Sequence, residues 1–184
     1  MTAVAEHRRL RLDLDCIVRD VGVTDLPALE WFGTHAHFRR LEESNYRDVE
    51  AGYKLWLVAE VNKFPVGHLK INLRVEDPLR GNPRGYIFAL RVFQPFQGLS
   101  IGTTLVRAAE ATLRARGFRY VSIAVGKDNP GARRLYERLG YSIYREEIGR
   151  WQYVDLDGRL HRMEEPEFLM DKPLGCATAK FPAC

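Results

Sequence analysis

One segment near the middle of the chain limits the fold more than any other. A hydrophobic run over residues 86–92 is followed by the turn Gln97-Gly98-Leu99-Ser100-Ile101-Gly102 and then by a helical pattern over residues 103–116. Another apolar run covers residues 120–125. A strand, a helix and a second strand in this order form a right-handed crossover unit. The two strands are therefore predicted to lie parallel in one sheet.

The turn before the helix predicts an anion site. The first amides of a helix have no partner inside it, and the helix dipole adds partial positive charge at the same place. Glycines such as Gly98 and Gly102 let a ligand approach the backbone closely. Phosphate or pyrophosphate is the expected ligand. Taken alone, the turn is equally compatible with an ordinary connection between a strand and a helix.

A second segment, residues 129–141, gives the chain a family resemblance. Its pattern is carried by Asn129, Ala132, Leu135, Tyr136, Gly140 and Tyr141. Together with Gln97, Ser100 and Gly102, this pattern resembles the two motifs of the GNAT family of acyl-CoA-dependent N-acyltransferases. Ser100 departs from the family, which usually has glycine at that position.

The resemblance implies an α/β (α+β) fold. The expected architecture is a mixed, mostly antiparallel sheet of six or seven strands with about four helices and the crossover unit at its centre. Since 184 residues suit one domain, we expect a single domain over residues 14–172. A flexible arm over residues 1–13 and a frayed tail over residues 173–184 complete this prediction.

Local patterns predict the remaining elements. The expected strands cover residues 10–18, 55–60, 66–75, 85–93, 120–125, 141–153 and 168–170. The expected helices cover residues 24–32, 36–50 and 103–116, with a further helix beginning at Pro130. Turns are expected at residues 62–65 and at Asp157-Gly158, and a loop at residues 76–84.

The resemblance also implies which residues bind acetyl-CoA, the expected co-substrate. Main-chain amides of the turn would hold its pyrophosphate, and the main chain of two residues in the preceding strand would pair with its pantetheine arm. These cofactor-binding candidates are Leu90, Val92, Gln97, Gly98, Leu99, Ser100, Ile101, Gly102 and Thr103. Asn129 is expected to contact the cofactor arm and also to cap the following helix.

Tyr136 is the catalytic candidate. The resemblance implies that its hydroxyl donates a proton to the departing CoA sulfur, a role suited to a phenol that stays protonated at neutral pH. The alternative is a purely structural role, because Tyr136 shares one helix face with Ala132, Leu135 and Leu139.

The general base is less well defined. Many relatives carry a glutamate on the strand before the phosphate turn, whereas residues 88–91 here contain no carboxylate. Candidates elsewhere are Glu43, Glu60, His68 and Glu146, and a chain of water molecules is the alternative.

The acceptor pocket and metal binding are judged from the first helices and the late hairpin. Six aromatic residues there either line an acceptor pocket or belong to the core: Trp31, Phe32, Phe38, Tyr46, Trp151 and Tyr153. His35 and His37 lack an evident third ligand, so no metal is expected.

Composition narrows the partners and the setting. The net charge is +4, without a basic run interleaved with aromatics, so no nucleic acid is expected. The chain contains no run of about 18 apolar residues, so no membrane span is expected. The three cysteines, Cys16, Cys176 and Cys184, are not clustered. They favour a reducing, cytoplasmic setting.

The predicted function is transfer of an acetyl group from acetyl-CoA to a primary amine on a small molecule, protein or peptide. Because no cysteine lies in the motifs to carry the acyl group, we expect direct attack in a ternary complex. A homodimer is left open. The alternative is an acyl-CoA-binding sensor without turnover, which the missing strand carboxylate favours and the presence of Tyr136 opposes.

Overall fold

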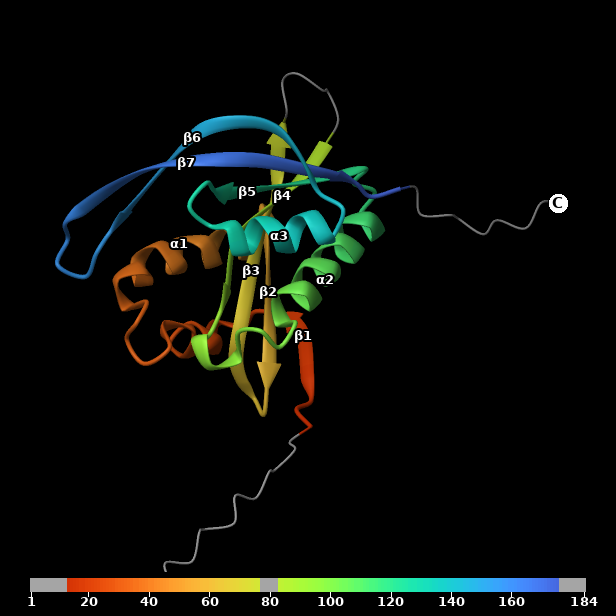
Figure 1. Ribbon diagram of the computed structural model, residues 1–184. Coiled ribbons are helices and arrows are strands. Elements are labelled where there is room, and N and C mark those ends of the chain that lie inside the picture. The colour runs from red at the N-terminus through yellow and green to blue at the C-terminus, as the bar shows by residue number, and fades with distance from the viewer. Residues whose placement is uncertain (1–12, 77–82, 176–184) are drawn as a thin grey trace, which may run out of the picture.

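Seven strands form one sheet in the computed structural model, which describes residues 13–76 and 83–175 (Figure 1). Their spatial order is β1-β2-β3-β4-β5-β7-β6. The strands are β1 (Cys16–Asp20), β2 (Lys54–Val61), β3 (Phe64–Glu76), β4 (Pro83–Val92), β5 (Tyr120–Gly126), β6 (Ser142–Val154) and β7 (Leu160–Pro173). β4 and β5 are parallel, and the other neighbouring pairs are antiparallel. The predicted mixed, mostly antiparallel α/β fold is confirmed.

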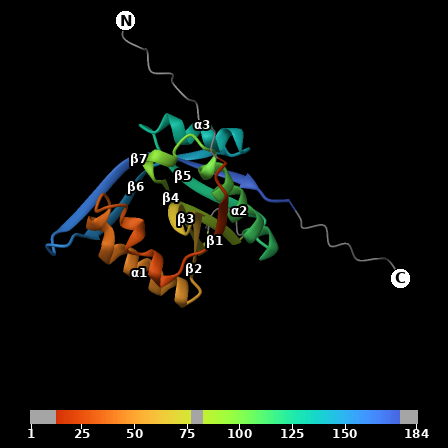
Figure 2. The same cartoon turned by 90° about the horizontal axis from the view of Figure 1, so that it is seen from below.

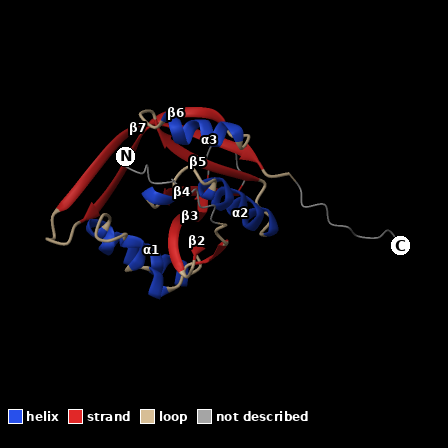
Figure 3. Cartoon of the chain, turned by 60° about the horizontal axis from the view of Figure 1, so that its bottom comes forward, coloured by secondary structure: helices blue, strands red, loops and turns tan. Residues whose placement is uncertain are grey.

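Helices cover both faces of this sheet (Figures 2 and 3). The α-helices are α1 (Arg39–Glu50), α2 (Ile101–Ala115) and α3 (Pro130–Arg138). Four short 3-10 helices are η1 (Val23–Asp25), η2 (Ala28–Glu30), η3 (Ala36–Phe38) and η4 (Gln94–Phe96).

Side chains that alternate along β3 show which face each helix covers. Gly67 faces α2, since a Cβ built there would lie 3.1 Å from Ile101 and 3.2 Å from Leu105. Lys70, three residues later, points to the opposite face and forms an ion pair with Glu42 of α1. The period of two along a strand thus separates a face covered by α2 from a face covered by α1.

The helix expected over residues 24–32 is wrong. The chain forms η1 and η2 instead, interrupted at Pro27, which lacks an amide donor. Trp31 and Phe32 then have left-handed backbones, with φ of 42° and 60°, which no α-helix can contain. The cap contact is also different, because the Gly22 amide donates to Asp25 Oδ2 at 2.7 Å.

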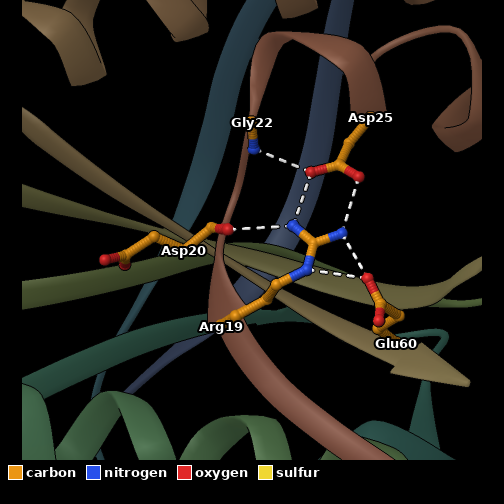
Figure 4. A network of polar contacts seen from close by, with 5 residues as sticks. All are labelled: Arg19, Asp20, Gly22, Asp25 and Glu60. Atoms are coloured by element: carbon orange, nitrogen blue, oxygen red, sulfur yellow. Dashed lines mark hydrogen bonds and ion pairs between the residues drawn. The ribbon is translucent and has the colours of Figure 1, made fainter. Parts of the chain in front are cut away.

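An arginine network fixes this irregular segment to the sheet (Figure 4). Arg19 of β1 donates to both carboxylate oxygens of Asp25, at 2.7 and 2.8 Å, and its Nη2 lies 2.6 Å from Glu60 of β2. The guanidinium lowers the pKa of the Asp25 carboxyl through this hydrogen bond. Its fork geometry suits two carboxylates at once.

The predictions for the two ends of the chain can be compared with the structure only in part. β1 begins at Cys16, so the strand expected from residue 10 starts later, and residues 10–12 lie outside the described part. The predicted arm and tail also fall mostly outside it, as does most of the loop expected at residues 76–84. Within the described residues, no helix is long and apolar enough to cross a membrane.

Candidate active site

The central feature of the site is the divergence of β4 from β5. Their parallel pairing covers Arg84–Ile87 on β4 and Tyr120–Ile123 on β5 and then stops, although both strands continue. Ala89 has a left-handed backbone with φ of 50°, and the register between β3 and β4 shifts at the same point. A bulge of this kind bends a strand. Beyond it, β4 and β5 have no ladder pairs with each other, and Leu90 and Val92 lie in this part of β4, which is unpaired on its β5 side although Val92 still pairs with Gly67 of β3.

The turn after β4 leads into α2, and the first amides of α2 have no hydrogen-bond acceptor in the described part of the chain. Among the described residues, the hydrogen bonds include none donated by the amides of Ile101, Gly102 or Thr103. The first turn of α2 has no acidic residue and no side-chain cap. These donors and the helix dipole make the turn suitable for an anionic group.

Gln97 has a structural contact inside this turn. Its side-chain Nε2 donates to the Val92 carbonyl at 3.0 Å and so ties the turn back to β4. Gly98 has a φ of 79°, which glycine adopts without strain. Leu99 is 56% exposed, so its side chain contributes little to packing.

Gly102 lies where α2, α3 and β4 meet. A Cβ at this position would lie 3.5 Å from Leu135, 3.9 Å from Leu90 and 4.0 Å from Val92. These are ordinary contact distances, so a methyl group fits. The two further methyl groups of a valine would press on Leu135 of α3 and on Leu90 and Val92 of β4.

Ser100 occupies a backbone conformation that favours glycine, with φ of 65° and ψ of 8°. We expect Ser100→Gly to raise the free energy of unfolding by up to about 1 kcal/mol, because glycine removes the steric cost of a left-handed residue. The dissociation constant for acetyl-CoA should stay the same. Urea unfolding and calorimetry measure the two effects.

Ser44→Gly, on the exposed face of α1, is the matched control and should destabilise, because glycine is a poor helix former. A loss of acetyl-CoA affinity in Ser100→Gly beyond about tenfold would show that the Ser100 hydroxyl itself contacts the ligand.

Asn129 and Tyr136 are positioned by α3. The Asn129 side chain accepts a hydrogen bond from the Ala132 amide at 3.0 Å, which confirms the predicted cap. Tyr136 is 4% exposed and packs in the core beside Tyr141. Burial raises the pKa of the Tyr136 phenol, so its hydroxyl stays protonated and can donate.

Two cavities lie on the other side of β4, against α1 and the 3-10 helices. The larger, of about 500 Å³, is lined by Val23, Leu26, Pro27, Leu29, Glu30, His35, Arg39, Glu42, Glu43, Trp56, His68 and Arg91. The smaller, of about 330 Å³, is lined by Trp31, Thr34, His35, Leu90, Arg91, Val92, Phe93, Gln94 and Gln97. His35 and Arg91 border both, and the smaller cavity reaches the unpaired part of β4.

The structure separates the four candidate bases. Glu43 and His68 line the larger cavity. Glu60 forms an ion pair with Arg19. Glu146, on the edge strand β6, forms an ion pair with Lys127. Burial, together with nearby cations, lowers the pKa of His68 well below its usual range, so its imidazole stays neutral.

His35 is a candidate that the sequence reasoning missed as a base. Burial lowers the pKa of its imidazole, and the neighbouring Arg91 and His37 lower it further. Its ring is held edge-on to Trp31, with ring centroids 5.2 Å apart. The sequence placed His35 with the acceptor-side helices, where it was considered only as a metal ligand, and nothing in its spacing indicated that β4 would lie beside it.

A charged network lies under the larger cavity. Glu42 of α1 forms an ion pair with the buried Lys70 and reaches Arg91 at 3.4 Å. Burial lowers the pKa of Lys70 to about 8, although the Glu42 carboxylate opposes this shift. Lys70 Nζ also lies 4.2 Å from the centre of the Trp56 ring.

The predicted aromatic pocket is only partly assembled. Trp31 borders the smaller cavity, and Phe32 is 86% exposed. Phe38 packs against Trp151 and Tyr153 of the hairpin, with centroids 6.0 and 4.8 Å apart. In the ranges that the structure describes, no group of three or more His, Cys, Asp or Glu side chains could hold a metal ion.

A glycine turn at a helix N-terminus, beside two diverging parallel strands, places the chain among α/β proteins whose site suits a phosphate-bearing ligand. The sequence profile of the acetyltransferase (GNAT) family matches residues 22–141, more than half of the chain. The chain belongs to this family.

Relatives and solved structures support the assignment. An uncharacterized N-acetyltransferase of Methanocaldococcus jannaschii is 34% identical over 86 residues, which are 47% of this chain and 38% of that protein. The chain matches its first curated relatives over less than half of their length.

Two solved structures share the fold. The ribosomal-protein-S18-alanine N-acetyltransferase of Escherichia coli has a TM-score of 0.66 and 21% identity, and the match covers 92% of this chain and 100% of that one. NAA60 of Arabidopsis thaliana, solved with acetyl-CoA, has a TM-score of 0.64 and 18% identity, covering 86% and 98% of the two chains.

Proposed function

We propose that this protein transfers an acetyl group from acetyl-CoA to a primary amine. The observation that carries the proposal is the set of unused α2 amides beside the unpaired end of β4. Amides of residues 98–103 suit the pyrophosphate, whereas the Gln97 amide, also expected to take part, already donates to the Gln94 carbonyl at 3.2 Å. The main chain of Leu90 and Val92 suits the amides of the pantetheine arm. Asn129, at the start of α3, is proposed to contact the same arm.

The proposed chemistry is direct attack. When bound, acetyl-CoA supplies the acetyl group as a thioester. The amine nitrogen forms a bond to the carbonyl carbon, and the carbon–sulfur bond breaks with its electron pair on sulfur. Tyr136 gives its proton to this sulfur, and His35 takes the proton that the amine loses. Solvent then restores both side chains.

Thiol release from acetyl-CoA, measured with a panel of amines, tests this proposal. Acetyl-CoA should bind in calorimetry without added metal, and turnover should require an amine. If acetyl-CoA binds tightly but releases no thiol with any of the amines, the alternative, an acyl-CoA sensor, is favoured. Tighter binding of ATP than of acetyl-CoA would contradict the proposed ligand.

The pH dependence of turnover tests His35. Since a protonated imidazole cannot accept a proton, the wild-type rate should fall relative to His35→Gln as pH drops through the His35 pKa. That pKa lies below its usual 6.5, because burial, Arg91 of β4 and His37 of η3 lower it more than Glu42 of α1 raises it. At high pH, where the rate no longer changes with pH, kcat/KM of His35→Gln should be about 10²-fold lower than that of the wild type.

The comparison uses the ratio of wild-type to variant kcat/KM, because titration of the amine substrate cancels in it. His37→Gln, in the same 3-10 helix, serves as the control and should keep the wild-type profile. A ratio that does not change with pH would exclude His35 as the base and favour water or His68.

The nature of the acceptor and the setting also belong to this proposal. One protein that shares the fold is named as a ribosomal-protein-S18-alanine N-acetyltransferase, which supports a peptide amine as one candidate acceptor beside a small-molecule amine. The cytoplasmic setting rests on the cysteine content and stays a prediction.

A further inference from the structure

Arg91 lies at the junction of the two cavities. It is the residue after Leu90 on β4 and is paired in register with His68 of β3. Its side chain is 25% exposed and borders both the larger and the smaller cavity. An acceptor amine in either cavity would therefore lie near this guanidinium.

Arg91 has little counter-charge. Among the residues that the structure describes, its ion-pair partner is Glu42, at 3.4 Å, and Glu42 is shared with Lys70. Burial lowers the pKa of Arg91, and Glu42 is the group that opposes this effect. One carboxylate thus faces two cations, the buried Lys70 and the partly exposed Arg91, which leaves a local excess of positive charge.

The other carboxylates of the larger cavity do not neutralise this excess. Glu30 is bound by Arg39 through two hydrogen bonds, at 2.5 and 2.8 Å. Glu43 is exposed at the rim on α1. The central carbon of the Arg91 guanidinium lies over the Phe38 ring, 4.5 Å from the ring centre. A contact with a ring uses none of the five N–H donors of a guanidinium in a conventional hydrogen bond to oxygen, so Arg91 keeps N–H groups for another acceptor besides Glu42.

We propose that Arg91 binds a carboxylate of the acceptor, so that the preferred substrate is an amine with a carboxylate a few bonds from its nitrogen. This inference rests on the proposed acetyl transfer. Guanidinium and carboxylate match in charge and in planar geometry. Both a free amino acid and a peptide with an acidic first residue have this chemistry. The apolar wall formed by Val23, Leu26 and Leu29 suits the rest of the molecule.

The experiment compares matched amines with the full chain. Phenylalanine is paired with phenethylamine, and a peptide that begins with aspartate is paired with one that begins with asparagine. Dissociation constants are measured by titration of the CoA-loaded protein, and KM by thiol release. The carboxylate member of at least one pair should bind about 10- to 100-fold more tightly, and the pair that shows this identifies the source.

Variants assign the effect to Arg91. Arg91→Gln should remove the preference while keeping the affinity for acetyl-CoA and the melting temperature, whereas Arg91→Lys should keep part of it through charge alone. Arg47→Gln is the control: it removes an exposed charge on α1, away from Arg91 of β4, and should keep the full preference for the carboxylate-bearing amine.

The outcomes separate this inference from the proposed function. Equal use of both members of each pair overturns the inference but leaves acetyl transfer intact, as does a preference that persists in Arg91→Gln. Failure of the CoA-loaded protein to bind any of the four amines also overturns it. Failure to bind acetyl-CoA at all overturns the proposed function itself.

Discussion

Replacement of Tyr136 by phenylalanine should lower kcat for thiol release by about 10²- to 10⁴-fold, the usual contribution of a positioned acid or base. The ring is kept, so the contacts of Tyr136 in the core should survive. Burial raises the pKa of this phenol, so the hydroxyl still carries its proton when the thioester breaks and the sulfur becomes basic. Steady-state kinetics and a melting curve on one purified variant measure both effects.

Tyr141→Phe is the matched control, because Tyr141 is also buried and also has a raised pKa, which burial and the nearby Glu110 cause. Its removal should leave kcat close to that of the wild type. If Tyr136→Phe keeps full kcat where chemistry limits the rate, the hydroxyl is not the acid, and Tyr136 serves only the core.

The second large effect is expected on stability. Arg84 of β4 is 1% exposed and donates from Nη1 to Asp171 of β7 at 2.9 Å. Arg84→Met would leave the buried Asp171 carboxylate without this cation. The free energy of unfolding should fall by about 3–5 kcal/mol, as for other broken buried pairs. Urea unfolding measures the loss.

Two controls define the cause. Arg150→Met breaks a pair with Glu164 whose side chains are 68% and 64% exposed, and it should cost less than about 1 kcal/mol. The double variant Arg84→Met with Asp171→Leu removes both buried charges and should recover much of the loss. A small effect of Arg84→Met would mean that water or other groups solvate Asp171 well.

The crossover unit could be predicted because its signals are local. The apolar run of β4, the glycine turn, α2 and the Asn129 cap each follow from neighbouring residues, and the structure has them within a few positions. The pair β4 and β5 is parallel as expected. The motif residues of the cofactor site lie at the divergence of these strands, and their binding roles stay predictions.

The segment before α1 could not be predicted in the same way. Thr24-Asp25 looks like the start of a helix, but Asp25 is used by Arg19, which is brought close only by the pairing of β1 with β2. The left-handed backbones at Trp31 and Phe32 depend on packing, because Trp31 is buried and its indole N–H donates to the Pro65 carbonyl at 2.8 Å. Such contacts have no signal in the local sequence.

The charged groups of the acceptor side were missed for a related reason. Lys70 interrupts an apolar strand, and Glu42 lies on a polar helix, so each looks like a surface residue when considered alone. Only the placement of α1 over β3 brings them together and leaves Arg91 underneutralised. Long-range contacts of this kind need the fold.

The two candidate binding surfaces are built from different stretches of the chain. The wall of the larger cavity comes mainly from residues 23–43, whereas the turn and the unpaired strand end come from residues 90–103. Two residues, His35 and Arg91, border both cavities. Mutations at the positions of the first stretch that line only the larger cavity can therefore alter which amine is accepted without touching the residues beside the donor, so that acceptor choice and donor binding can change independently.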